Sequence, residues 1–328
     1  MDLLTEDDMR VFVSRIIPES GLHRLKEAGV DLEVWPHPLP PSQETLLERV
    51  SGCHGILSML SDSLDAEVMD AAGVQLKVIS NFAVGTNNID LQEATRRGIS
   101  VGNTPDVLTD ATADLAMALL LGAARRIGEA QSYVKAGAWK SWEPVGHMGV
   151  DLKEKTLGIY GMGRIGAALA ERCAGGWGMK VVYCSRHPKD HIAPPGAERV
   201  DFNTLLEVSD FVSVHTPLTE ETQGRFNADA FKRMKPTAVF INTARGPIHD
   251  QGALHTALKT QQIFAAGLDV TQPEPMNATD PLLSLPNCIV LPHIGSATIQ
   301  TRNTMATIAA ENILLGLDGR PLRCPVST

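Results

Sequence analysis

Short apolar runs alternate with amphipathic stretches in the first third of the chain, which is typical of a parallel sheet with helices on both faces. Stretches such as SGLHRLKEAG and SQETLLERVSG mix apolar and polar positions at helical spacing and are predicted helices. The apolar runs between them are predicted strands, at residues 10–15, 55–60, 76–80 and 99–103.

The alternation is more regular in the second half of the chain. Its apolar runs are almost uninterrupted, as expected for strands that are buried on both faces. Six such strands are the number that a Rossmann domain needs. The predicted strands are 156–161, 180–185, 211–216, 238–243, 265–270 and 288–293.

Between these regions the strand pattern stops at Pro105, and a long Ala- and Leu-rich helix is predicted from about Asp110. A last helix is predicted at about 297–317. We therefore expect an α/β protein with two doubly wound parallel-sheet domains, a Rossmann nucleotide domain being inserted into a flavodoxin-like one. The predicted boundaries are 106–296 for the dinucleotide-binding domain, and 1–105 with 297–328 for the substrate-binding domain.

Composition and charge narrow the class of protein. The net charge of −9 argues against a general nucleic-acid or membrane-surface binder. The five cysteines are odd in number and form no CxxC pair, so a disulfide framework or a metal centre is not expected. The acidic start, MDLLTEDDMR, is unlike a signal peptide. The longest apolar run, 115–124, is too short for a membrane span and favours a buried or dimer-facing helix. We expect a cytoplasmic protein.

A glycine pattern follows the predicted strand 156–161. Gly161, Gly163 and Gly166 have the spacing G-x-G-x-x-G between a strand and a helix, the context in which this pattern indicates a dinucleotide site. Gly161 permits the tight turn, Gly163 lets the backbone approach a pyrophosphate, and Gly166 allows the helix to pack closely on the strand. The alternative is a glycine-rich turn that binds nothing.

The next predicted strand ends without the carboxylate that usually binds the ribose of NAD. Ser185 and Arg186 stand there instead, and Asp190 lies too far along to substitute for it. Arg186 can pair with a 2′-phosphate and Ser185 can donate to it, so NADPH is expected to be preferred over NADH. The alternative for Arg186 is a solvated surface charge.

Three further predicted strands of the second half are followed by polar residues that carry chemistry: Arg245, Asp269, Glu274 and His293. Ligands of doubly wound sheets bind outside the carboxyl ends of the strands. These side chains should therefore converge near one edge. Each one alone could equally be structural, since a histidine at a strand end or an Arg-Gly turn is common.

The segments GMGRIG, HTPLTEET, NTARG, AAGLDV, PEP and PHIGSAT occur in this order. In this ordered set the chain resembles the D-2-hydroxyacid dehydrogenase family over nearly its whole length. The segments VLTDATADLAMALLL and WKSWEP resemble most closely the family's glyoxylate/hydroxypyruvate reductases.

The resemblance implies a role for each catalytic candidate. His293 matches the acid/base that protonates the carbonyl oxygen, a task for which an imidazole suits neutral pH. Glu274 matches the carboxylate that orients His293, and Arg245 matches the residue that binds and polarises the 2-oxo acid. Asp269 matches a residue near the nicotinamide carboxamide. The other cofactor-binding candidates implied are Arg164, Ile165, His215, Thr216, Pro217, Thr222, Thr243, Ala244 and Gly295.

On the substrate side, Val84 and Gly85 match the loop whose backbone N–H groups hold the substrate carboxylate, although a plain turn is the alternative. Ser296 and Arg302 resemble family residues near the substrate. Trp142 matches a tryptophan that reaches the substrate site of the partner subunit in a homodimer. The alternative for Trp142 is packing in its own core.

The function expected from the sequence is reduction of glyoxylate or hydroxypyruvate to glycolate or D-glycerate, by hydride transfer from NADPH with His293 as acid/base. Two alternatives stay open. One is a reductase of another 2-oxo acid, such as 2-ketogluconate or hydroxyphenylpyruvate. The other is a non-catalytic dinucleotide-sensing protein, like the corepressors that share this fold.

Overall fold

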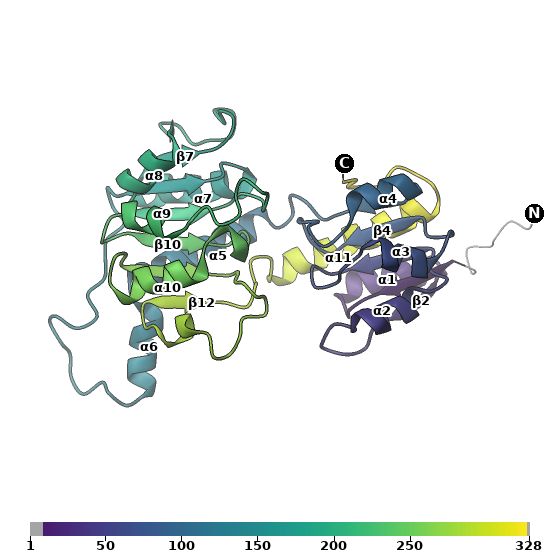
Figure 1. The fold of residues 1–328 in the computed structure, drawn as a ribbon, viewed down its shortest axis with the longest axis horizontal. Coiled ribbons are helices and arrows are strands. Elements are labelled where there is room, and N and C mark those ends of the chain that lie inside the picture. Colours follow the sequence, from purple (N-terminus) through teal and green to yellow (C-terminus); the bar gives the residue numbers. More distant parts are fainter. Residues whose placement is uncertain (1–8, 327–328) are drawn as a thin grey trace, which may run out of the picture. The chain divides into compact units, whose positions relative to one another are not determined.

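The computed structural model describes residues 9–326. They divide into two compact units, one made of 9–108 with 297–326 and the other of 109–296 (Figure 1). The first crossing lies three residues later than the sequence suggested, at 108/109 instead of 105/106. Val107 and Leu108 explain the difference, because both pack against the core of the first unit.

The first unit is a five-stranded parallel sheet with the order β2-β1-β3-β4-β5. This is the flavodoxin-like order. Its strands are β1 (Arg10–Val13), β2 (Asp31–Val34), β3 (Gly55–Ser58), β4 (Val78–Asn81) and β5 (Ser100–Gly102). Its helices are α1 (Glu19–Glu27), α2 (Gln43–Val50), α3 (Ala66–Ala72), α4 (Leu91–Arg97) and α11 (Ile299–Leu317).

Two elements of this unit differ from the sequence prediction. The strand β2 was not predicted, because its sequence DLEV lies at the edge of the sheet and none of its residues is fully buried. The helix α11 begins at Ile299, two residues after the predicted start. Thr298 ends the preceding loop by accepting a hydrogen bond from the N–H of Thr301, at 3.1 Å.

The second unit is a seven-stranded parallel sheet with the order β12-β11-β10-β9-β6-β7-β8. Its strands are β6 (Thr156–Tyr160), β7 (Lys180–Cys184), β8 (Glu198–Arg199), β9 (Phe211–Val214), β10 (Val239–Asn242), β11 (Ala265–Leu268) and β12 (Cys288–Val290). The predicted class, two doubly wound parallel sheets, is confirmed. The strand β8 was not predicted, because both of its residues are charged and exposed.

Helices cover both faces of this sheet. The helices α5 (Thr109–Ala124) and α7 (Arg164–Trp177) pack on one face. Figure 1 shows α8 (Phe202–Val208), α9 (Ala228–Arg233) and α10 (Gln251–Lys259) side by side along the other face. Two short 3₁₀ helices, η2 (Gly246–Ile248) and η3 (Pro281–Ser284), follow β10 and β11.

The apolar character of α5 comes from burial in its own unit, because Leu119 and its neighbours pack on β10 and β11. A group of exposed apolar side chains lies instead on α6 (Ile127–Lys135), which buries none of its residues, and on the segment 136–150. Both extend away from the sheet (Figure 1). Among residues 9–326, no helix combines the length and apolar character that crossing a membrane requires.

Candidate active site

The glycine loop joins β6 to α7 and has a different constraint at each glycine. Gly161 has φ = 101°, and a Cβ there would lie 2.7 Å from the backbone of His215 and Thr216. A Cβ at Gly166 would lie 2.5 Å from the carbonyl oxygen of Gly161, so helix and strand touch. A Cβ at Gly163 would meet nothing within 4 Å. The loop therefore presents open backbone at the start of α7, and the N-terminus of a helix favours an anion.

His293 and Glu274 form a hydrogen-bonded pair between Nδ1 and Oε1. His293 follows β12, and Glu274 lies in the loop after β11. Burial works to raise the pKa of Glu274, but the hydrogen bond and charge of His293, with further help from Arg245, hold it below its usual range. Glu274 is therefore a carboxylate at neutral pH, able to orient the imidazole through Nδ1 and leave Nε2 for another group.

The loop that carries His293 is fixed by Asp269, which follows β11. Both carboxylate oxygens accept backbone hydrogen bonds, from the N–H groups of Ile294 and Gly295, each at 2.7 Å. Burial raises the pKa of Asp269, although these two bonds oppose the change. His293 itself has φ = 54°, a conformation in which histidine is enriched among non-glycine residues. The two bonds hold the backbone in this uncommon conformation.

Arg245 follows β10 and is fixed through Asn242, a residue of the NTARG segment that the sequence did not single out. The amide of Asn242 donates to the carbonyl of Arg245 at 2.9 Å and accepts from the N–H of Ala244 at 2.9 Å. Burial lowers the pKa of Arg245, and the charge of Glu274 partly offsets this. A guanidinium remains charged in such a setting. Positive charge therefore lies near the His293–Glu274 pair.

These groups share one edge because every strand of the sheet runs in the same direction. The glycine loop, Arg245, Asp269 and His293 each follow the carboxyl end of a strand. The order reverses between β6 and β9, where ligands of doubly wound sheets bind.

The remaining cofactor candidates of this unit line the same loops. His215 and Thr216 follow β9, and the ring of His215 is hydrogen bonded to Ser213 Oγ at 2.8 Å. Thr222 is buried and donates to the carbonyl of Pro217 at 2.8 Å. Within the described chain, the buried Thr243 Oγ1 has no hydrogen-bond partner. A dinucleotide fits this arrangement, since it would bring polar groups to an unsatisfied hydroxyl and to the open backbone at Gly163.

The turn after β7 holds Ser185 and Arg186 at the surface. Ser185 Oγ donates to the carbonyl of His187 at 2.8 Å. Arg199, from β8, donates to the carbonyls of both Ser185 and Arg186, at 3.1 and 2.9 Å. The backbone of the turn is therefore tied down while the Arg186 side chain is exposed.

Val84 and Gly85 lie in the other unit, in the loop between β4 and α4. Val84 is 40% exposed. The guanidinium of Arg302 lies 5.8 Å from the ring centroid of Phe82 in the same loop. Ser296 belongs to the second unit and directly follows Gly295.

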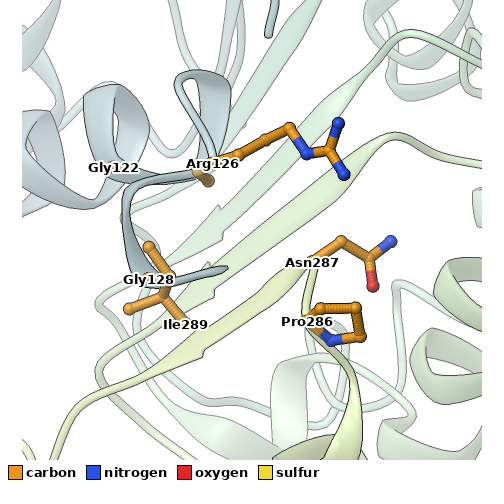
Figure 2. A pocket seen from close by; sticks show the side chains of 7 residues that line it. Gly122, Arg126, Gly128, Pro286, Asn287 and Ile289 are labelled. Atoms are coloured by element: carbon orange, nitrogen blue, oxygen red, sulfur yellow. The ribbon is translucent and has the colours of Figure 1, made fainter. Parts of the chain in front are cut away.

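Trp142 is 80% exposed and lies in the segment after α6, so it is not part of its own core. Figure 2 shows a small hollow near α6, which is lined by Gly122, Ala123, Arg126, Gly128, Pro286, Asn287 and Ile289. Its volume of about 10 Å³ has room for roughly one water molecule. None of the catalytic candidates lines this hollow.

Comparisons with known proteins show what this chain is similar to. The model of the family described as "D-isomer specific 2-hydroxyacid dehydrogenase, NAD binding domain" matches residues 117–295. A glyoxylate reductase of Korarchaeum cryptofilum is 49% identical over 307 residues, which cover 93% of this chain and 92% of that protein. A glyoxylate reductase/hydroxypyruvate reductase of Homo sapiens is 48% identical over 316 residues, 96% of each chain.

Among solved structures, the fold is similar to an NADPH-dependent glyoxylate/hydroxypyruvate reductase of Sinorhizobium meliloti in complex with NADP and malonate. The TM-score is 0.84 at 32% identity, and the match covers 98% of this chain and 97% of that one. This chain therefore belongs to the D-isomer specific 2-hydroxyacid dehydrogenase family and is an NAD(P)-dependent oxidoreductase.

Proposed function

We propose that this chain uses NADPH to reduce glyoxylate and hydroxypyruvate to glycolate and D-glycerate. The observation that carries the proposal is the His293–Glu274 pair beside the charged Arg245, at the edge that also holds the glycine loop. The names of the two relatives that are nearly half identical, both glyoxylate reductases, support the choice of substrate.

Each catalytic side chain has a defined task in this proposal. Arg245 binds the 2-oxo acid and draws electron density toward its carbonyl oxygen. His293 gives a proton from Nε2 to that oxygen, while Glu274 keeps the ring oriented through its hydrogen bond to Nδ1. Asp269 fixes the loop of His293 and lies where the nicotinamide carboxamide would bind. The dinucleotide, when bound, supplies the hydride.

Residues of the second unit would hold the dinucleotide. The open backbone at Gly163 and the N-terminus of α7, with Arg164 and Ile165, suit the pyrophosphate. Thr243 offers its unsatisfied hydroxyl. His215, Thr216, Pro217, Thr222, Ala244 and Gly295 complete the proposed site.

The preference for NADPH rests on the turn after β7. Arg186 is an exposed cation where a carboxylate would bind the ribose of NADH, and Ser185 is next to it. Arg199 donates hydrogen bonds to the backbone carbonyls of both residues and adds a further positive charge to the turn. The solved NADPH-dependent reductase with bound NADP supports a preference of this kind. A 2′-phosphate would meet charge-assisted donors here.

The substrate carboxylate would be held by the backbone N–H groups of Val84 and Gly85. Ser296 and Arg302 are further proposed substrate-binding residues.

We further propose a homodimer, because apolar side chains of α6 and 136–150 are exposed together. They are Ile127, Val134, Trp139, Trp142, Val145 and Met148, each more than half exposed. In this assembly Trp142 reaches the substrate site of the partner subunit, and sedimentation velocity should give the mass of a dimer.

A steady-state panel tests the proposed function. NADH and NADPH are crossed with glyoxylate, hydroxypyruvate, pyruvate and 2-ketogluconate. The highest kcat/KM is expected for NADPH with glyoxylate or hydroxypyruvate. A clear preference for 2-ketogluconate or pyruvate would replace the proposed substrate. No turnover with any acid, combined with tight nucleotide binding, would favour a dinucleotide sensor.

A further inference from the structure

The loop between β4 and α4 has three consecutive backbone carbonyls that all accept hydrogen bonds from other residues of the first unit. The carbonyl of Ala83 accepts from the N–H of Thr104 at 2.8 Å. The carbonyl of Val84 accepts from Asn103 Nδ2 at 2.8 Å, and that of Gly85 from Asn81 Nδ2 at 2.8 Å. Two asparagine side chains therefore fix the orientation of two of these peptides.

Fixing a carbonyl also fixes the next N–H group. A trans peptide is planar, and its C=O and N–H bonds point in opposite directions. The N–H groups of Val84, Gly85 and Thr86 must then point away from the groups that hold the carbonyls. Among residues 9–326, no acceptor takes a hydrogen bond from these three N–H groups. The preceding N–H groups differ, since Phe82 donates to Ser58 and Ala83 to Asn81.

Asn81 cannot turn its amide around. It is fully buried at the end of β4. Its oxygen accepts from Ser58 Oγ at 3.0 Å, and its Nδ2 donates both to Gly85 and to Asn88 Oδ1, at 2.8 and 3.0 Å. Asn88 is held in turn by the carbonyls of Met59 and Asp62, each at 3.0 Å. The donor side of the Asn81 amide therefore always faces the loop.

We infer that Asn81 and Asn103 are positioning residues for the substrate carboxylate: their amides hold the carbonyls of Gly85 and Val84 so that the neighbouring N–H groups face the ligand. This inference rests on the proposed function, in which this loop binds a 2-oxo acid. Every 2-oxo acid carries the same carboxylate, so the two asparagines set affinity for the whole class. They do not select among its side chains.

Asn103 gives the cleaner test, because its side chain is partly exposed and, within residues 9–326, is hydrogen bonded only to the carbonyl of Val84. Asn103→Ala removes the donor, and Asn103→Asp keeps the size but can only accept. Both variants should raise the KM for glyoxylate about three- to tenfold, with kcat within about twofold, because the carboxylate contact is the same in ground and transition states. The dissociation constant of NADPH should not change.

Asn287→Ala is the matched control. Its amide donates to the backbone carbonyls of Leu258, in α10, and of Phe264, which precedes β11, far along the chain from the proposed substrate loop. This variant can lose thermal stability, yet its KM for glyoxylate should equal that of the wild type. A normal KM in Asn103→Asp with a raised KM in Asn103→Ala would indicate packing and overturn the inference, as would unchanged values in both.

Binding of oxalate to the NADPH complex, measured by calorimetry, separates this inference from the proposed function. Absence of glyoxylate reduction in the wild type would contradict the proposed function but not this inference. The inference would then be tested by the affinity for oxalate, which both Asn103 variants should bind about three- to tenfold more weakly than the wild type. Equal affinity of the wild type and variants for oxalate, or no binding at all, would overturn it.

Discussion

The loops after β10, β11 and β12 are fixed by several buried or charged hydrogen bonds, whereas the turn after β7 carries its important side chain in solvent. Asp269 uses both carboxylate oxygens to hold the loop of His293, and Asn242 holds the backbone of Arg245. In the turn after β7, Arg199 and Ser185 hold the backbone, and the Arg186 side chain is exposed.

The contrast follows from what each region has to do. A proton transfer needs its donor within hydrogen-bond distance of one atom, so a small displacement is costly. Discrimination between NADPH and NADH, which differ by one phosphate, needs only a positive charge close to that phosphate. A long, flexible arginine side chain can provide this charge without being held in one conformation. Substitutions in the first region should therefore change rate, and those in the second should change preference.

The largest effect is expected for His293→Ala. Loss of the proton donor should lower kcat about 10³-fold, within the usual range for general acid–base catalysis. The dissociation constant of NADPH, measured by fluorescence titration, should stay close to that of the wild type. His23 provides the control: it pairs with Glu27 at 3.1 Å on the exposed surface of α1. His23→Ala should keep full activity, and full activity in His293→Ala would refute the assignment.

Arg186→Ala should give the next largest effect. Removing one charge-assisted contact to a 2′-phosphate should lower the ratio of kcat/KM for NADPH over NADH about 10- to 100-fold, through the NADPH value. The control is the exposed Arg233 of α9, which pairs with Glu207 of α8 at 3.1 Å. An unchanged ratio in Arg186→Ala would show that the cofactor is chosen elsewhere.

The same contrast explains what the sequence could predict. Buried strands can be recognised in the sequence as apolar runs. Because the carboxyl ends of parallel strands share one edge of the sheet, Arg245, Glu274 and His293 could be predicted to lie close together. The edge strands β2 and β8 have no such runs and were missed. Arg199 was missed with β8, although it ties the turn that carries Arg186.

The hydrogen-bond partners of polar side chains could not be predicted from the sequence either. Nothing in the segment NTARGPIHD shows that the amide of Asn242 would meet both the carbonyl of Arg245 and the ring of His249, at 2.9 and 3.0 Å. Such contacts depend on how the chain turns after β10, which residue types alone do not determine. The roles of Asn81 and Asp269 in fixing their loops were hidden for the same reason.

The smallest expected effect is on stability. It concerns His249, which is hydrogen bonded to Asn242 in the region that holds Arg245 and whose titration makes the stability of this region depend on pH. His249 is 2% exposed, and burial lowers its pKa to about 4, below the value of about 6.5 in an unfolded chain. Between these values the unfolded state binds more protons, so the stabilisation is present above pH 6.5 and is lost as pH falls toward 4. From pH 8 to pH 5.5 this one group should lower the free energy of unfolding by about 1.4 kcal/mol.

Urea unfolding of the wild type and of His249→Val at pH 8 and pH 5.5 measures this effect. The loss of unfolding free energy in the variant is subtracted from that in the wild type, which cancels the contribution of the other titrating groups. An equal loss in both proteins would mean that His249 titrates normally and that the region under Arg245 is less tightly closed than its hydrogen bonds indicate.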